Sequence, residues 1–242
     1  MKTLVIIPSR LSATRLPGKP LLKINGISMI SHVFKRAETA NIGEVVVATE
    51  DQEIIDDVKS NGGNAILTSK KHKTGTDRIH EALAILARKD IDFIMNVQGD
   101  EPDIDINDIK NLDKKMKMNR SKIGTLAGKI IDPKMYGDQN VVKVKVKKPF
   151  NKNPFPYAIS FTRITQDKQN VYHHIGIYCY EVKTLKKFIS FKQSKGELEN
   201  SLEQLRALDN NIDINVALAN TSPIGVDTKE DYLAIKKIME YK

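Results

Sequence analysis

The chain is poor in cysteine and aromatic residues and has no tryptophan. Its 242 residues include one cysteine, Cys179, which excludes a disulfide within the chain and predicts a reducing compartment, the cytoplasm. No apolar run reaches the roughly 20 residues that a membrane-spanning helix needs, so we expect no membrane contact. The first apolar run, in MKTLVIIPSR, stops at Pro8, and we interpret it as a buried strand and not as a secretory signal.

The charge balance is basic, with a formal net charge of +9. Such a balance can indicate a nucleic-acid partner. However, the basic runs KKMK (114–117) and KVKVKKP (143–149) contain no aromatic side chains on which bases could stack. We therefore interpret the charge as a solvated lysine surface and expect no nucleic acid. A basic nucleic-acid-binding module remains the non-enzymatic alternative, and it predicts salt-sensitive binding that survives Asp100→Asn.

Apolar strands alternate with amphipathic helices through the first hundred residues. This rhythm predicts an α/β fold with a Rossmann-like, doubly wound and mostly parallel sheet. Ligands bind beyond the carboxyl ends of the strands in such sheets. We place Thr76 as the N-cap of the third helix. The expected strands are 3–9, 44–50, 64–69 and 92–100, and the expected helices are 28–40, 51–62 and 76–89.

The second half is richer in strands, and we expect part of its sheet to be antiparallel. The spacing of Thr228 and Asp231 predicts a capped final helix. We favour a single domain, with 1–120 and 210–242 as a nucleotide-binding core and 121–209 as a smaller strand-rich part. The strands are expected within 122–130, 140–148, 157–164, 171–180 and 212–220, and two helices near 183–191 and 199–209.

A short cationic loop follows the first strand. The loop holds Arg10, Arg15 and Lys19. It also holds two prolines, which stiffen the backbone, and a glycine, which lets the backbone approach a ligand closely. Guanidinium and ammonium groups suit a polyanion such as a nucleoside triphosphate. The plainer interpretation is a basic surface loop. Neither GxGxxG nor GxxxxGK[ST] follows the strand, so a dinucleotide fingerprint and a P-loop are not supported.

Two carboxylates follow two further strands and could face that loop. Asp100 comes after the fourth strand, and Asp227 precedes the last helix. Together they could hold a hard cation such as Mg²⁺ that bridges phosphate oxygens. Each could also be an ordinary turn or cap residue. A helix N-terminus at Thr74, Gly75 and Thr76 could hold a base or a phosphate.

Seven segments, in this order, resemble the 3-deoxy-manno-octulosonate (Kdo) cytidylyltransferases. They span nearly the whole chain: RLSATRLPGKPL, VVVATED, HKTGTDRI, NVQGDEP, HHIGIY, SLEQLRAL and GVDTKED. The resemblance implies the nucleotide-diphospho-sugar transferase type of sheet and a homodimer paired through 121–209. It also implies that the anomeric hydroxyl of Kdo attacks the α-phosphorus of CTP with the help of Mg²⁺. The products would be pyrophosphate and CMP-Kdo, which serves lipopolysaccharide synthesis.

The resemblance also implies roles for individual residues. Lys19, Asp100 and Asp227 would be catalytic, and the two aspartates would hold Mg²⁺. The nucleotide would be bound by Arg10, Arg15, Lys19, Thr74, Gly75, Thr76 and Arg78. The sugar would be surrounded by Gln98, Arg163, His174, Tyr178, Glu203 and Gln204. Arg163 suits the carboxylate of an acid sugar because its fork matches that group.

The chain departs from the family pattern on the sugar side. ITQDKQ follows Arg163 where the family usually has a proline-containing segment, His173 replaces a lysine or arginine, and Asn200 replaces a glutamate. An amino- or deoxy-variant of Kdo is therefore an alternative acceptor. The chain could also be a nucleotidyltransferase for a sialic-like acid or a sugar 1-phosphate, or an inactive relative. The sugar 1-phosphate is disfavoured because the second half has no second dense cationic loop.

Overall fold

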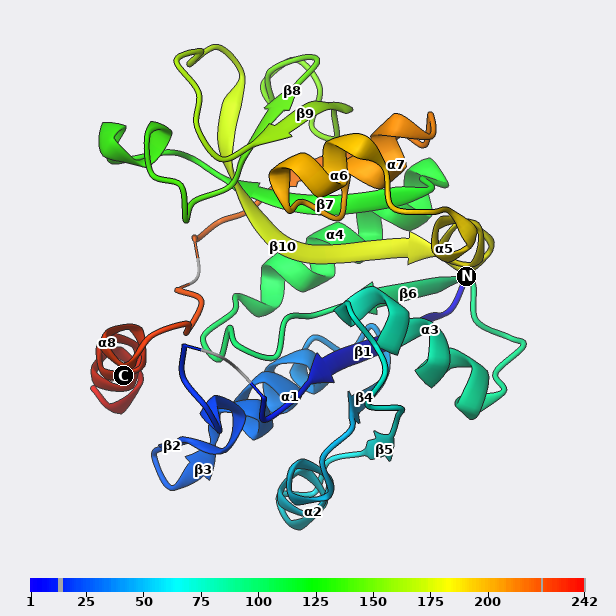
Figure 1. Cartoon of the computed structure of the whole chain (residues 1–242), viewed down its shortest axis with the longest axis vertical. Coiled ribbons are helices and arrows are strands. Elements are labelled where there is room, and N and C mark those ends of the chain that lie inside the picture. The colour runs from blue at the N-terminus through cyan, green and yellow to red at the C-terminus, as the bar shows by residue number, and fades with distance from the viewer. Residues whose placement is uncertain (13–14, 223, 242) are drawn as a thin grey trace. The chain divides into compact units, whose positions relative to one another are not determined.

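The computed structural model describes residues 1–12, 15–222 and 224–241, which form two compact units (Figure 1). The first unit comprises residues 1–110 and 223–242, and the second comprises 111–222. The expected division into nucleotide-binding and sugar-binding parts at 120–121 and 209–210 stays a prediction. No helix within the described residues is long and apolar enough to cross a membrane.

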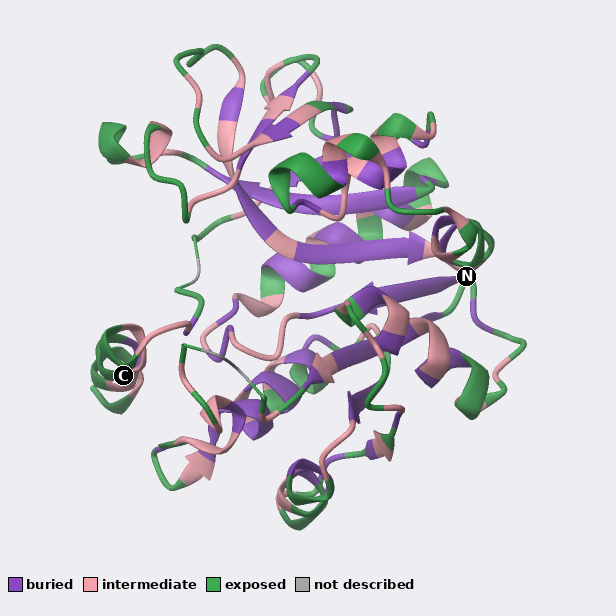
Figure 2. Ribbon diagram, viewed as in Figure 1, coloured by how far each residue is buried: buried purple, intermediate pink, exposed green. Residues whose placement is uncertain are grey.

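The first unit contains a parallel four-stranded sheet, in the order β6, β1, β4, β5. The central strand β1 is buried along its length (Figure 2). Its register with β4 runs from the Thr3–Gly43 pair to the Ser9–Thr49 pair, so both strands end at the same edge. This confirms the predicted parallel α/β sheet. The bounds are β1 (Thr3–Ser9), β4 (Gly43–Thr49), β5 (Ala65–Leu67) and β6 (Phe93–Asn96).

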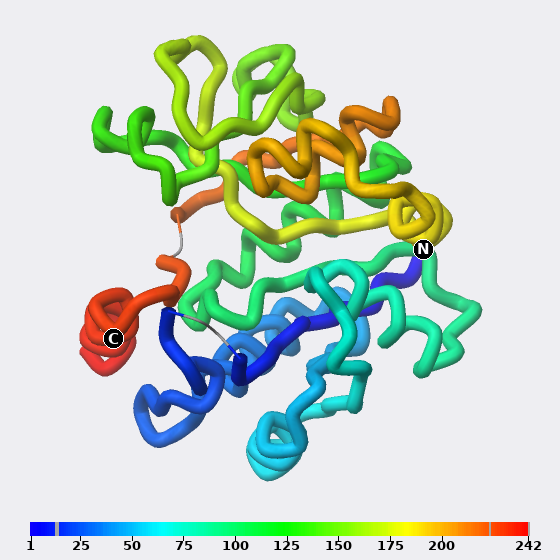
Figure 3. Tube along the Cα trace, viewed as in Figure 1, coloured from blue at the N-terminus to red at the C-terminus, as the bar shows by residue number. Residues whose placement is uncertain are grey.

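Amphipathic helices accompany this sheet. The helix expected over 28–40 is confirmed as α1, and its apolar residues Ile30, Val33, Phe34 and Ala37 are buried. The C-terminal segment returns next to the hairpin β2–β3 (Figure 3). There the Tyr232 hydroxyl donates to the Lys23 carbonyl at 2.6 Å. The bounds are η1 (Lys19–Leu21), β2 (Lys23–Ile24), β3 (Ile27–Ser28), α1 (Met29–Thr39), α2 (Gln52–Ser60), α3 (Gly75–Leu86) and α8 (Lys229–Glu240).

Two helix N-termini test the capping predictions. The capping box of α8 is confirmed, because the Thr228 and Asp231 side chains each accept from the other residue's backbone N–H. The placement of Thr76 as an N-cap was wrong. Thr74 is the N-cap of α3, and its hydroxyl accepts from the N–H of Asp77 at 3.1 Å. Thr76 lies inside the first turn of the helix and is buried, so it is not at the cap position.

The second unit contains a mixed sheet around β7. β7 pairs antiparallel with β10 and parallel with β11, and β8 pairs antiparallel with β10 and β9. This confirms a partly antiparallel second half. The bounds are β7 (Ile123–Gly128), η2 (Pro133–Tyr136), β8 (Lys143–Val146), β9 (Ala158–Thr162), β10 (Val171–Glu181), α5 (Val182–Ser190), α6 (Lys195–Asn200), α7 (Leu205–Asp209) and β11 (Ile214–Leu218). The remaining helix, α4 (Ile106–Asn119), begins in the first unit and ends in the second.

The expectation of a single helix over 199–209 was wrong. α6 ends at Asn200, and α7 begins at Leu205. Ser201 separates them in a left-handed conformation with φ of 52°, and its N–H bonds to the Glu197 carbonyl as a C-cap. This backbone conformation cannot continue a right-handed helix, so the segment divides in two.

Candidate active site

A cavity of about 340 Å³ lies in the first unit, beyond the carboxyl ends of β1 and β6. This is the edge at which parallel α/β sheets bind ligands. Most of the predicted nucleotide-binding and catalytic residues line it, namely Arg10, Arg15, Lys19, Thr74, Gly75, Arg78, Asp100 and Asp227, and so does Gln98, which was predicted to bind the sugar. Thr76 is not among the lining residues. His72 and Lys73 also line the cavity, and sequence reasoning missed them although both belong to the HKTGTDR segment.

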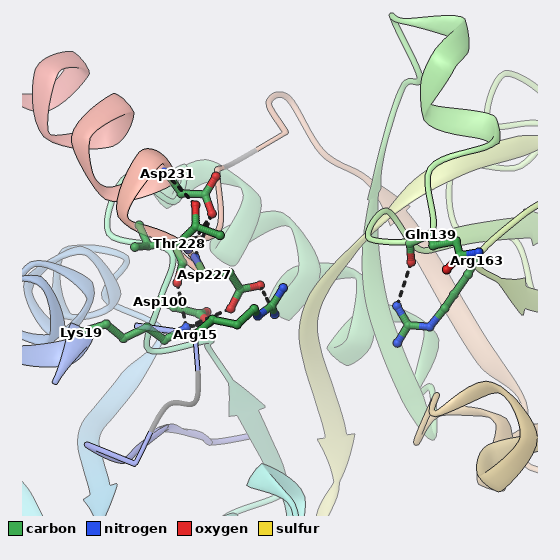
Figure 4. Close-up of polar contacts among 9 residues, drawn as sticks. Arg15, Lys19, Asp100, Gln139, Arg163, Asp227, Thr228 and Asp231 are labelled. Atoms are coloured by element: carbon green, nitrogen blue, oxygen red, sulfur yellow. Dashed lines mark hydrogen bonds and ion pairs between the residues drawn. The ribbon is translucent and has the colours of Figure 1, made fainter. Parts of the chain in front are cut away.

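Lys19 lies between the two predicted catalytic carboxylates (Figure 4). Its Nζ is 2.8 Å from Oδ2 of Asp100 and 3.2 Å from Oδ1 of Asp227, and it donates to the Val226 carbonyl at 2.7 Å. Burial alone would lower the pKa of Lys19, but the charges and hydrogen bonds of the two aspartates outweigh it and raise the pKa. The ammonium therefore stays charged at neutral pH.

The two aspartates come from segments that the backbone joins. Asp100 follows β6, and its carbonyl accepts from the N–H of Val226 at 2.9 Å. Asp227 precedes the cap of α8, and its own N–H donates to the Asp231 carboxylate at 3.1 Å. The Asp227 carboxylate also pairs with Nη2 of Arg15 at 2.7 Å (Figure 4). Two cations and two carboxylates thus meet at one side of the cavity.

The two carboxylates offer the open oxygen ligands that a hard divalent cation needs. Oxygens of both aspartates contact one ammonium, so a single cation can be shared between them. Asp100 is 31% exposed and Asp227 is 45% exposed, which leaves room for water and phosphate oxygens. Mg²⁺ usually takes one or two carboxylates and completes its shell with such oxygens. Within the described residues no three His, Cys, Asp or Glu side chains form a closed metal cage.

Arg78 lines the cavity but is held by the protein. Its side chain is almost fully buried and forms an ion pair with Glu50. It also donates to Oγ1 of Thr68 at 2.6 Å and to the Ser69 carbonyl at 3.4 Å. These contacts fix the segment that leads into α3, so Arg78 shapes the wall of the cavity.

The predicted sugar residues apart from Gln98 lie in the second unit. Arg163 follows β9, and its guanidinium donates to the Gln139 carbonyl at 3.0 Å (Figure 4). It also donates to the carbonyls of Asn200 at 3.2 Å and Ser201 at 3.2 Å. Buried Lys143 also donates to the Arg163 carbonyl. The Arg163 fork therefore holds three backbone carbonyls from two segments, at 139 and at 200–201, which sequence reasoning did not predict.

A bulge in β10 brings His174 and Tyr178 together. The register with β7 shifts between Ile175 and Tyr178, and the rings of His174 and Tyr178 are 5.5 Å apart. The Thr125 hydroxyl lies 2.7 Å from the Ile177 carbonyl and 3.1 Å from Nε2 of His174. A hydroxyl has one proton, and the closer carbonyl takes it, so Nε2–H of His174 donates to Thr125. Bulges of this kind re-aim side chains near functional sites.

Glu203 and Gln204 lie at the start of α7. Gln204 is the N-cap residue of that helix. Oε1 of Glu203 is 3.6 Å from Nη2 of buried Arg206. Burial raises the pKa of the Tyr178 phenol, and the charges of Tyr180 and Glu203 raise it further, so Tyr178 stays a neutral hydroxyl.

The stability of the fold should depend on pH through His174. Burial, and then the charge of His173, lower the pKa of His174 from 6.5 to about 3. The unfolded chain therefore binds a proton near pH 6.5 and the folded chain only near pH 3, so the free energy of unfolding decreases as the pH falls below 6.5. Between pH 6.5 and 5.5, wild type should lose about 1 kcal/mol more than His174→Asn. Urea unfolding at both pH values measures this, and equal losses would contradict it.

The fold and the cavity define a class. A parallel α/β sheet with a cationic loop after its first strand and two carboxylates across from that loop is the arrangement of a nucleotidyltransferase. The family model described as Cytidylyltransferase matches residues 4–214. The 3-deoxy-manno-octulosonate cytidylyltransferases of Bartonella tribocorum and Thermodesulfovibrio yellowstonii are each 40% identical to the chain. Each alignment covers 99% of the chain, and 99% and 98% of the respective relatives.

A solved structure agrees with these relatives. It is a CMP:2-keto-3-deoxy-manno-octonic acid synthetase complexed with CTP, 33% identical, with a TM-score of 0.90 over 100% of this chain and 99% of that one. The chain belongs to the 3-deoxy-manno-octulosonate cytidylyltransferase family. It is therefore an enzyme of the nucleotidyltransferase class. A UDP-glucose pyrophosphorylase complexed with UDP-glucose is 12% identical to the chain, with a TM-score of 0.73. At this low identity the similarity shows only that the two have the same fold.

Proposed function

We propose that the chain transfers the cytidylyl group of CTP to the anomeric hydroxyl of Kdo, giving CMP-Kdo and pyrophosphate. The observation that carries this proposal is Lys19 held between Asp100 and Asp227 in the cavity of the first unit. Membership in the family supports the choice of nucleotide and acid sugar. Positioning and charge neutralisation supply most of the catalysis in phosphoryl transfer, and this site offers both.

The nucleotide is bound by the cationic loop and the start of α3. Arg10 and Arg15 bind the triphosphate, and Lys19 neutralises charge that develops on the departing pyrophosphate. Thr74 and Gly75 border the cavity at the N-terminus of α3, which favours an anion. Thr76 and Arg78 support that terminus from inside.

Asp100 and Asp227 would hold Mg²⁺, because both carboxylates already share one cation and remain partly open. When bound, Mg²⁺ would polarise the phosphate oxygens and add positive charge beside the reacting phosphorus. The residues of this chain hold the two carboxylates in place. Lys19 contacts both, and Arg15 orients Asp227.

The acid sugar is bound by Gln98, Arg163, His174, Tyr178, Glu203 and Gln204. Arg163 supplies positive charge for the sugar carboxylate. His174 is neutral at working pH because its pKa is about 3, so it offers a hydrogen bond to a hydroxyl and no charge. A related acceptor, an amino- or deoxy-Kdo, is the alternative that the departures near Arg163 suggest.

We also propose the cellular setting that the family implies. The chain works in the cytoplasm as a homodimer paired through 121–209, and its product supplies lipopolysaccharide synthesis. The single cysteine supports the compartment. Sedimentation analysis of the purified chain tests the dimer.

The assay is pyrophosphate release by purified protein with Mg²⁺. CTP, UTP and ATP are each paired with Kdo, an amino-Kdo and a sialic acid. We expect release with CTP and Kdo, and little with UTP or ATP. If pyrophosphate is released with CTP and another acid sugar but not with Kdo, the enzyme is a cytidylyltransferase whose acceptor is that other sugar. No release from any pair by folded protein would contradict the proposed function.

A further inference from the structure

A side chain from a neighbouring segment contacts the base of the loop that carries Arg10, Arg15 and Lys19. The carboxylate of Asp51 accepts from the backbone N–H of Leu11 at 2.7 Å, across 40 positions of sequence. The carbonyl of the same Leu11 accepts from the N–H of Gly18 at 3.0 Å. Leu11 is therefore the residue at which the loop is closed on itself and fastened to the sheet.

The register of the sheet explains this contact. β1 and β4 are paired in parallel up to Ser9 and Thr49. Leu11 and Asp51 each come two residues after that last pair, so the chain places them side by side. The Thr49 hydroxyl accepts from the N–H of Asp51 at 3.2 Å and fixes the turn between β4 and α2.

Asp51 makes this bond in place of a local one. It is the N-cap residue of α2, and aspartate at that position normally accepts from the N–H groups of its own helix. Its side chain forms no such cap bond. The carboxylate instead reaches the neighbouring loop, which gives Asp51 a use that helix stability alone does not require.

The hydrogen bond from Leu11 N–H to Asp51, called the tether below, lies where it can affect how the nucleotide is bound. Arg10 directly precedes Leu11, and Lys19 directly follows Gly18, so the two ends of the closed loop are two lining residues of the cavity. Gly18 has φ of 70°, which sets the direction in which Lys19 leaves the loop. A shift of the Leu11 backbone would move both cations relative to the phosphates, and small displacements of positioned groups lower rates strongly.

We propose that Asp51 is a positioning residue of this enzyme, which holds the cationic loop in its triphosphate-binding geometry through the Leu11 N–H. The proposal rests on the proposed function in that the triphosphate is CTP. Asp51 is not among the residues that line the cavity. It acts on the nucleotide step and not on the acid sugar.

The test compares Asp51→Ala, Asp51→Asn and a control, Asp56→Ala. Asp56 lies on the exposed side of the same helix, where it bonds to Gln52. We expect Asp51→Ala to raise the KM for CTP about tenfold, the cost of one hydrogen bond to a charged acceptor, and to leave the KM for Kdo within about twofold. Asp51→Asn keeps an acceptor oxygen and should recover most of the loss. Asp56→Ala should equal wild type.

Three outcomes would overturn the tether. The first is an unchanged KM for CTP in Asp51→Ala. The second is a parallel rise in both KM values with a lower thermal midpoint, which would show a purely structural role. The third is an Asp51→Asn variant as impaired as Asp51→Ala.

Calorimetric titration of CTP separates this proposal from the proposed function. Wild type that binds CTP without turning over Kdo contradicts the function, and the binding ratio of wild type to Asp51→Ala still decides the tether. Wild type that binds no nucleoside triphosphate overturns both.

Discussion

Asp100→Asn lowers kcat by roughly a thousandfold, the upper range for removal of one electrostatic group at a reacting centre. The substitution keeps the size of the side chain but removes the charge that faces Lys19 at 2.8 Å. It also removes one of the two anionic groups available to Mg²⁺. Because the carbonyl of Asp100 makes the bond to Val226, the backbone connection survives. Steady-state rates at saturating CTP and Kdo measure the effect.

Asp105→Asn is the matched control for that variant. Asp105 lies five residues further along, outside the cavity lining, and its side chain accepts from the N–H of Asn107 at 2.8 Å, which an amide oxygen can also do. It should retain the activity of wild type. Circular dichroism should show both variants folded. Near-normal turnover by Asp100→Asn would remove this carboxylate from the mechanism.

Lys19→Met lowers kcat/KM for CTP by roughly a hundredfold or more. Methionine retains most of the apolar stem but leaves Asp100 and Asp227 without the ammonium that lies between them. The two carboxylates then repel each other, and the triphosphate loses a positive charge. The measurement is initial rate against CTP concentration at fixed Mg²⁺ and saturating Kdo.

Lys23→Met serves as the control for Lys19→Met. Lys23 is exposed on β2, and its contact with Tyr232 is made by the backbone carbonyl. It should behave as wild type. Lys19→Arg should rescue little, since a planar fork does not replace a compact ammonium between two carboxylates. Full activity of Lys19→Arg would show that any cation at this position suffices.

The parallel core was predictable because its signals are local. Buried β1 and β4 read as continuous apolar runs, and α1 shows its apolar face in the spacing of Ile30, Val33, Phe34 and Ala37. α4 was not predicted, because its many lysines made the segment resemble a solvated surface. Three of its apolar residues are nevertheless fully buried, namely Ile109, Leu112 and Met116. The helix break at Ser201 depends on the left-handed backbone conformation of that residue, which a serine in the sequence does not predict.

The site was predictable in part for a related reason. Carboxyl ends of parallel strands share an edge, so Arg10, Lys19 and Asp100 were expected to lie together. The direct contact of Lys19 with both aspartates was not expected, because it depends on the pairing of Val226 with Asp100. The sugar residues came from the family resemblance, and nothing local in the sequence indicates that the Arg163 fork holds backbone carbonyls.

Cytidylyl transfer requires that the phosphorus next to the cytidine passes to the acid sugar. Two labelled substrates, [α-³²P]CTP and [γ-³²P]CTP, follow this atom directly when each is incubated with the protein, Mg²⁺ and Kdo and the products are separated by chromatography. We predict that the α-label appears in a nucleotide-linked acid sugar and the γ-label in pyrophosphate. A γ-label in the sugar would show phosphoryl transfer in place of cytidylyl transfer, and would contradict the proposed reaction.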